Sequence, residues 1–494
     1  MDFSADLKNK IKNNIKRLSQ EGAEYIDARF FSNDDLEELI LEDGNLETNR
    51  TLYESGVGVR VLWGGAWGFA ATSDLSGLNE CFDLAANNAK TASKLVDIKL
   101  DMGKAASHRD SFSTSYETDY FDVSLKDKLD FLKSIDDKLK DTWIVQRHIR
   151  AQFQRSRVLF INSEDTEIEK NIRDVFAHME ITAIDKDGEA QKRSHDLYTT
   201  GFGTRGYEMF QNPELFSSHS IRIKNELSEL IKADELEFGK RSVIVLPGQG
   251  FLQVHETIGH PLELDRILGY ELSYAGGSFV NLDSFGKLRY GSEKLNVSAG
   301  GDIINSPGTF GFDDEGTKEG NYLLIDKGIL VNAISSRAMI SEANQKSGFE
   351  LFKNSGGCSR STAFYRAPID RMSNVNILPG NDGTLEDIIA STEDGIIVDT
   401  PLSWSIGSNR EHFHFACEIA WEVKNGKRTR MLRNPSYQGH TLNFYNNLSA
   451  VGDASTWQLW QVDNCGKGEP NQALELGHGV PVFRVDNVLT GERK

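Results

Sequence analysis

The sequence predicts an α+β protein in two parts, an N-terminal α/β region with an antiparallel sheet and a C-terminal strand-rich domain. In the first half, runs with strand-like alternation of apolar and polar residues are interleaved with amphipathic helical stretches. From about residue 275 to the end, strand and turn patterns dominate. The length of 494 residues suggests roughly two to four domains, and the 38% hydrophobic content is typical of a folded chain.

The first hundred residues predict one helix–strands–helix module. Apolar side chains recur at helical spacing from residue 4 to 21, and Gly64-Gly65 predicts a turn between two strands. We therefore assign 1–105 to an N-terminal α/β module. Its expected elements are a helix at 4–21, strands at 23–31, 36–43, 57–61 and 66–72, and a helix at 75–95.

A polar stretch rich in Ser and Thr at 106–119 predicts a linker. We expect 119–235 to form a helix-plus-meander module, in which Asp187-Gly188 makes a hairpin turn. The remaining 236–494 would form the C-terminal strand-rich domain. The elements expected between 119 and 270 are helices at 123–139, 221–236 and 251–269 and strands at 144–154, 157–163 and 175–191.

The composition excludes several classes of function. There are 55 Lys and Arg against 74 Asp and Glu, a net charge of −19, so direct nucleic-acid binding is not expected. Four widely spaced cysteines do not make a disulfide framework and favour a reducing, cytoplasmic location. We find no leader-like apolar core at the start and no run of about 20 apolar residues, so no membrane association is expected.

The strongest chemical signal is the sequence HETIGH, from His255 to His260. Imidazole is a good zinc ligand, and Glu256 could deprotonate a metal-bound water. The familiar pattern has its histidines at i and i+4, whereas this one has an extra residue. On an ideal helix the two rings would lie about 140° apart. A chance cluster on a surface helix is the alternative interpretation.

Gly259 and Pro261 suggest how the spacing is repaired. Glycine tolerates unusual dihedral angles, and proline disfavours the α region for the residue before it. We therefore predict a π-bulge or a helix break at 259–261 that turns His260 back toward His255. A zinc site also needs a third protein ligand. Cys358 and Cys465 both lie in glycine-containing loops, and the residues alone do not choose between them.

The order of motifs along the chain resembles the TldD branch of the TldD/PmbA family, a group long labelled modulators of DNA gyrase and understood as metallopeptidases. The resemblance covers nearly the whole chain. The similar segments are GVGVRV at 56–61, GFAAT at 68–72, VHETIGHPLELD at 254–265, FDDEGT at 312–317, YRAPIDRMSNVNILPG at 365–380, CGKGEP at 465–470 and GHGVPVFRVDNVLTGE at 477–492.

The resemblance implies a zinc-dependent peptidase with one Zn²⁺ per chain. It implies that His255, His260 and Cys465 hold the metal and that Glu256 is the general base. It also implies a homodimer, or a heterodimer with a PmbA/TldE-type chain, that encloses the site and admits peptides or unfolded segments. Pro261 stands where the family has Gly, and the stretch after CGKGEP diverges, which leaves substrate preference and partner choice open.

Five further residues are weaker candidates. Glu263 and Asp265 could orient the ligands from behind, although a solvated helix face is the alternative. Arg366, Arg371 and Asn374 could bind the substrate backbone or a carboxylate, although structural ion pairs are equally compatible.

Two other functions compete with the peptidase. A catalytically inert PmbA-like partner or regulatory scaffold would lack the His/Glu/Cys set, and this chain retains it. A DNA-binding regulator is disfavoured by the negative charge.

Overall fold

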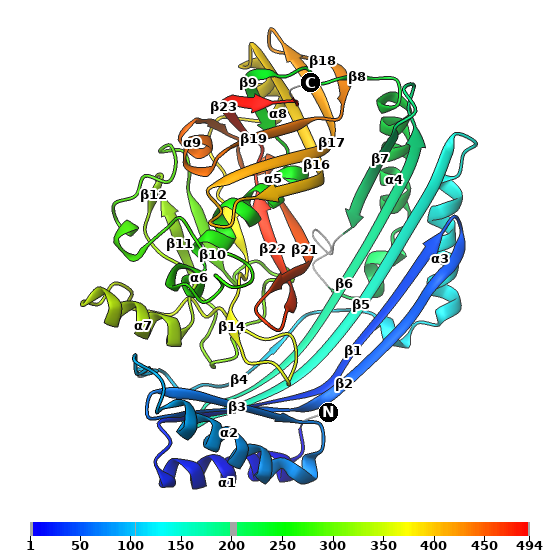
Figure 1. Cartoon of the computed structure of the whole chain (residues 1–494). Coiled ribbons are helices and arrows are strands. Elements are labelled where there is room, and N and C mark those ends of the chain that lie inside the picture. Colours follow the sequence, from blue (N-terminus) through cyan, green and yellow to red (C-terminus); the bar gives the residue numbers. More distant parts are fainter. Residues whose placement is uncertain (1–2, 104, 198–204, 493–494) are drawn as a thin grey trace.

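The computed structural model describes residues 3–103, 105–197 and 205–492, and it has the predicted two-part α+β architecture. One large sheet belongs to the N-terminal part, and a second large sheet with several smaller ones belongs to the C-terminal part (Figure 1). Within the described ranges, no helix combines the length and apolar character needed to cross a membrane.

The N-terminal sheet has seven strands in the order β3-β2-β1-β5-β6-β4, and β7 pairs with β6. Long antiparallel hairpins dominate it, because β1–β2 and β5–β6 each stay paired over nearly their full length. Since β1 pairs with β5, the first two predicted modules share one sheet. The strands are β1 (Tyr25–Glu42), β2 (Asn45–Trp63), β3 (Ala66–Thr72), β4 (Arg109–Ser113), β5 (Ile144–Asn162), β6 (Glu167–Ile184) and β7 (Ala190–Leu197).

In this sheet two sequence predictions are refined and a third is confirmed. The strands expected at 23–31 and 36–43 are one strand, β1, with a register irregularity near its middle. The polar stretch at 106–119 contains β4, an exposed edge strand parallel to β6, where polar side chains face water. The hairpin turn at Asp187-Gly188 is confirmed between β6 and β7, with Gly188 at a φ of 87°.

Four long helices pack near the two ends of this sheet (Figure 1). Two of them bury one face against β1, β2 and β3, and the other two contact one another beside β5, β6 and β7. They are α1 (Ala5–Glu21), α2 (Leu78–Ala92), α3 (Leu125–Leu139) and α4 (Pro213–Leu230). Short 3₁₀ turns lie at η1 (Leu75–Gly77), η2 (Tyr120–Asp122) and η3 (Tyr207–Gln211).

The C-terminal part is built on an eight-stranded mixed sheet in the order β16-β9-β23-β19-β17-β18-β8, with β20 paired to β23. Its strands are β8 (Asp234–Glu235), β9 (Gly239–Val245), β16 (Asp394–Ile406), β17 (His412–Lys424), β18 (Lys427–Arg433), β19 (Ser436–His440), β20 (Leu448–Val451) and β23 (Phe483–Thr490).

Smaller sheets and short helices surround it. The smaller sheets contain β10 (Val297–Gly300), β11 (Asn321–Asp326), β12 (Ile329–Leu330) and β15 (Val375–Ile377), then β13 (Ser359–Arg360) with β14 (Ile369–Asp370), and β21 (Gln458–Lys467) with β22 (Gln472–Val480). The helices are α5 (Pro247–Val254), α6 (Leu264–Leu268), α7 (Arg337–Ser347), α8 (Leu385–Ala390) and α9 (Thr441–Asn446), and the irregular turns are η4 (His255–Gly259), η5 (His260–Leu262), η6 (Leu282–Ser284) and η7 (Ala454–Thr456).

Glycines on β2 let the C-terminal part approach the N-terminal sheet closely. A Cβ at Gly58 would lie 2.1 Å from the carbonyl oxygen of Phe364, and one at Gly56 would lie 2.4 Å from its ring. The glycines of the GVGVRV motif are therefore required by this contact between the two parts. Their role is packing rather than turn formation.

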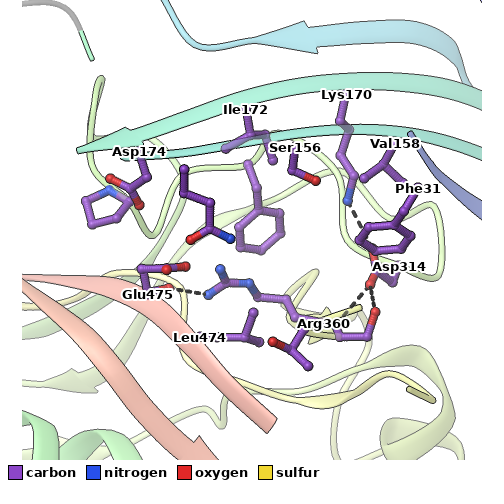
Figure 2. Close-up of a pocket in the computed structure, with 15 residues that line it drawn as sticks. Phe31, Ser156, Val158, Lys170, Ile172, Asp174, Asp314, Arg360, Leu474 and Glu475 are labelled. Carbon is purple, nitrogen blue, oxygen red and sulfur yellow. Dashed lines mark hydrogen bonds and ion pairs between the residues drawn. The ribbon is translucent and has the colours of Figure 1, made fainter. Parts of the chain in front are cut away.

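A small cavity of about 90 Å³ lies at the same junction (Figure 2). Lys170 on β6 donates to Asp314 over 3.0 Å, and Arg360 donates to the carbonyl oxygen of Glu475 over 2.9 Å. Burial, reinforced by the nearby Asp174, raises the pKa of the Glu475 carboxyl to about 8. The Lys170–Asp314 pair joins the two parts, whereas Arg360 and Glu475 both belong to the C-terminal part.

Candidate metal centre

The helix that carries HETIGH widens at the motif. α5 ends at Val254, a π-helical turn covers His255–Gly259, and a 3₁₀ turn follows at His260–Leu262. The backbone N–H of His260 bonds the carbonyl oxygen of His255, which is the five-residue closure of a π-helix. The predicted π-bulge is thus confirmed, but it covers His255–Gly259 rather than 259–261. His260 itself keeps helical angles (φ −59°, ψ −44°), so the expected departure from the α region before Pro261 is wrong.

The glycine at 259 has a different role from the one expected. Its φ of −57° is open to any residue. A Cβ there, however, would lie 2.1 Å from the sulfur of Met372, which is fully buried. Glycine is therefore needed for close packing of the widened turn against Met372 rather than for unusual dihedral angles.

The widened turn brings both histidines to one point, where Cys465 joins them. The ring centroids of His255 and His260 are 4.5 Å apart. Nε2 of His260 lies 3.5 Å from Sγ of Cys465, which is carried by β21. One ligand atom from each of the three residues lies within 4.8 Å of the others, and all three residues are buried. This is the spacing expected of atoms that could share one metal ion.

A group behind each imidazole orients the ring. Nδ1 of His260 lies 2.9 Å from Oε2 of Glu263, an acceptor, so Nδ1 carries the proton. Nδ1 of His255 lies 2.9 Å from Nε2 of His478, whose own Nδ1 donates to the carbonyl oxygen of Val375 over 2.8 Å. His478 must then accept from His255. In both ligands this leaves the Nε2 lone pair free for a metal.

The electrostatics favour the ligand forms of all three side chains. Burial lowers the pKa of His255 to about 4 and also lowers the pKa of His260, so both rings are neutral. Burial alone would raise the pKa of the Cys465 thiol, but the net effect of its surroundings is to lower the pKa, and the buried guanidinium of Arg371 contributes to that lowering. Neutral imidazole and thiolate are the forms that bind metal.

Glu256 lies at the same turn and is paired with a cation. Arg410 donates from Nη1 to its carboxylate and from Nη2 to the carbonyl oxygen of Ala275 over 3.1 Å. Arg410 is in the turn between β16 and β17 and has a φ of 65°, an uncommon conformation for a side chain of this size. The guanidinium thus fixes the carboxylate beside the ligands.

A buried ion-pair network supports the ligand segments. Lys467, two residues after Cys465, lies 2.6 Å from Asp265 and 3.3 Å from Glu263. Arg371 donates to the backbone carbonyl oxygens of Cys465 and Gln472. This network connects the helix, β21 and the segment before β15.

Comparison with known proteins identifies the family. The chain matches the PmbA/TldA metallopeptidase C-terminal domain over residues 239–491 and the PmbA/TldA metallopeptidase domain 1 over 30–89. A metalloprotease from Methanothermobacter thermautotrophicus is 26% identical, with 92% of each chain covered. A metalloprotease TldD homolog from Buchnera aphidicola is also 26% identical, covering 92% of this chain and 89% of the relative.

The chain belongs to the PmbA/TldD family of metallopeptidases. It is a peptidase of that family, as the resemblance of its motifs predicts. Two solved structures share the fold. A Thermotoga maritima protein has a TM-score of 0.73 at 16% identity, covering 98% of this chain and all of its own. TldE from Thermococcus kodakarensis has a TM-score of 0.69 at 14% identity, covering 99% of this chain and all of its own.

Three candidate substrate-binding residues of this PmbA/TldD chain have different surroundings. Arg371 is fully buried and bonds backbone carbonyl oxygens, as described above. Asn374 is fully buried and donates to the carbonyl oxygen of Gly300 and to the hydroxyl of Thr309. These contacts favour structural roles for both. Arg366 is half-buried and lines a larger cavity near the ligands.

The structure also separates the two cysteines expected in loops, because Cys465 lies in strand β21 rather than in a loop. Cys358 is buried beside the hydroxyl of Tyr322, and burial raises the pKa of its thiol to about 12. It is not in the ligand group. Of the two, only Cys465 joins the histidines, as the family resemblance implies.

Two residues at the site escaped sequence reasoning. His478 is 223 positions from His255, and Arg410 is 154 positions from Glu256. The position of His478 between two glycines was a weak indication of a functional role, and no sequence pattern pointed to Arg410. Only folding brings them to the motif.

Proposed function

We propose that this chain is a zinc-dependent peptidase whose metal is held by His255, His260 and Cys465. The observation that carries the proposal is the meeting of their three donor atoms at the widened turn. Two neutral imidazoles and one thiolate suit zinc, and three protein ligands leave a position for water. When bound, the zinc would polarise the substrate carbonyl and acidify that water.

Glu256 is proposed as the general base. It follows His255 directly and lies on the same turn, with Arg410 holding its carboxylate. Its carboxylate would take a proton from the attacking water and return it to the leaving amine. Arg410 would hold the carboxylate in a fixed orientation beside the ligands through its guanidinium contact.

The substrates we propose are peptides or unfolded polypeptide segments. β21 carries Cys465 and pairs with β22 on one side, while within the described ranges no strand pairs along its other edge. An extended chain could add to that edge and pass the metal. A folded protein has few free extended segments, so cleavage of an unfolded form should be much faster than cleavage of the same protein in its native state.

We also propose that the chain works as a dimer, either with itself or with a TldE-type partner, in the cytoplasm. The likeness of its fold to TldE supports a partner of similar shape. The absence of disulfides among its four cysteines suits a reducing compartment.

The test of the proposed function is peptide hydrolysis by the variant Glu256→Gln. The amide keeps the size and polarity of the side chain but cannot accept the proton, so hydrolysis should fall by about 10²-fold or more. Metal content should be unchanged, because Glu256 is not in the ligand group. The rate on an unfolded protein substrate and the bound metal are measured together. Hydrolysis at the wild-type rate would remove Glu256 from the mechanism.

A further inference from the structure

A large cavity lies beside the metal centre, where the N-terminal sheet meets the C-terminal part. Its volume is about 590 Å³. One wall comes from β2 and β3, through Arg60, Trp67 and Phe69. The opposite wall comes from the start of α7, the segment around β14 and the turn after β21, which Figure 1 places above β3. The established family activity does not by itself say what this cavity receives.

The cavity is built from the same segments that carry the metal ligands. Gly468 lines it and follows Cys465 by three residues, so their Cα atoms are at most about 11 Å apart. Glu271 lines it from the segment after His260, and Asp370 lines it next to Arg371. A side chain of a peptide held at the metal could therefore reach it.

Acidic side chains outnumber basic side chains in the lining of the cavity. Five carboxylates line it against two guanidinium groups. Arg60 is already paired with Asp27 and lies 3.5 Å from Glu315, and Asp265 is paired with Lys467. Three carboxylates, of Glu271, Asp370 and Glu469, then stand against Arg366 alone.

Two of these carboxylates are buried without an ion-pair partner among the described residues. Asp370 is 1% exposed, and its Oδ1 accepts from the backbone N–H of Ser336 over 3.0 Å. Its Oδ2 has no hydrogen-bond partner in the described part of the chain. Glu271 is 6% exposed and accepts from the N–H of Gly468 over 3.2 Å. Nζ of Lys467 donates to the backbone carbonyl oxygen of Asp370 over 2.6 Å, but it is paired with the carboxylates of Asp265 and Glu263.

Burying such groups costs free energy unless a partner arrives. Burial, followed by the neighbouring Asp265, raises the pKa of Asp370 well above its usual range. An entering cation would lower this pKa, favour the ionised carboxylate and give Oδ2 a partner.

Aromatic side chains also line the cavity. Trp67, Tyr270, Tyr274 and Tyr365 line the cavity, and the two tyrosines after His260 are more than half exposed. The guanidinium of Arg60 already lies over the ring of Trp67, 4.6 Å from its centroid. Aromatic faces combined with carboxylates are the surroundings that a Lys or Arg side chain prefers.

We propose that this cavity is a specificity pocket for a cationic side chain, a lysine or arginine close to the bond that is cleaved. The proposal rests on the proposed peptidase function and adds a substrate class to it. Arg366 makes the opposite preference, for an acidic side chain, the alternative that the test must exclude.

The experiment measures peptide binding separately from cleavage. Blocked seven-residue alanine peptides carry Lys, norleucine or Glu at one position, which is moved along the peptide. Their affinity for the metal-loaded Glu256→Gln protein is measured by calorimetry. We expect Lys to bind at least tenfold more tightly than norleucine at one or two positions, and Glu to bind more weakly. Asp370→Asn and Glu271→Gln, each in the same background, should reduce this ratio.

A matched control is Glu47→Gln, which removes an exposed carboxylate near the β1–β2 turn and should leave the ratio unchanged. Equal or undetectable affinity for the Lys and norleucine peptides at every position would overturn the assignment, as would a preference for Glu. Wild-type hydrolysis of the same peptides tests the underlying function. If the peptides are hydrolysed but Lys is not preferred, only the specificity proposal is wrong. If Lys is preferred in binding but no peptide is hydrolysed, only the proposed peptidase function is wrong.

Discussion

Each imidazole at the candidate metal centre is oriented by a side chain that lies outside the HETIGH sequence. Glu263 lies in the same segment as His260, so a carboxylate behind that ligand could be anticipated from the sequence. His478 contacts His255 from strand β22, 223 positions further along the chain. It is fully buried and fixed by the carbonyl oxygen of Val375. Its position determines which nitrogen of His255 is free.

Replacing His478 should therefore weaken metal binding without removing a ligand. In His478→Ala the acceptor for Nδ1–H of His255 is lost, and we expect zinc affinity to fall about 10- to 100-fold. Competition with a chelator of known affinity measures this. The matched control is His412→Ala, which changes an exposed histidine on β17. Unchanged affinity in His478→Ala would show that the ring of His255 is oriented by other contacts.

At the scale of elements, the features that depend on neighbouring residues in the sequence were mostly predicted correctly. The periodicity of apolar residues gave the long helices and hairpins, and the spacing of HETIGH required a widened turn. It could not show that Gly259 is needed for Met372, because that contact joins residues 113 positions apart. Nor could alternation alone join two predicted strands into β1 or find β4 within a polar stretch. Cys465 was identified through family resemblance rather than through its own surroundings.

Filling the space at the widened turn should cost stability. In Gly259→Ala the new methyl group would overlap the sulfur of Met372, and we expect a loss of about 1–3 kcal/mol in the free energy of unfolding. In a Met372→Ala background the same change should cost much less, since the overlapping atom is gone. Denaturant unfolding measures all three variants. Gly77→Ala, where nothing lies within 4 Å of the new Cβ, is the control. Equal costs in both backgrounds would refute the packing role.

At the scale of the whole molecule, charged side chains join the two parts across the junction shown in Figure 2. In the Lys170–Asp314 pair, each charge has a partner of opposite sign. In contrast, burial and the nearby Asp174 raise the pKa of the Glu475 carboxyl to about 8. An acid whose pKa is raised on folding destabilises the folded state as pH rises from its unfolded value to its folded value. This penalty is absent below about pH 4.5 and complete above about pH 8.

Glu475→Gln should remove that penalty. We expect the variant to melt at least about 2 °C above wild type at pH 8.5 and close to wild type at pH 4.5. Thermal unfolding across this pH range measures the difference, with Glu47→Gln as an exposed control. A difference that is constant with pH would show that Glu475 titrates alike in the folded and unfolded chains.

The central claim is that His255, His260 and Cys465 hold one metal ion, and the metal content of the purified protein tests it most directly. Elemental mass spectrometry should find about one zinc per chain in the wild type, with loss in His255→Ala and in Cys465→Ala. Cys358→Ala, which changes a buried cysteine outside the ligand group, should retain it. No metal in the wild type after zinc is supplied, or full zinc content in His255→Ala, would contradict the account and favour an inert partner protein.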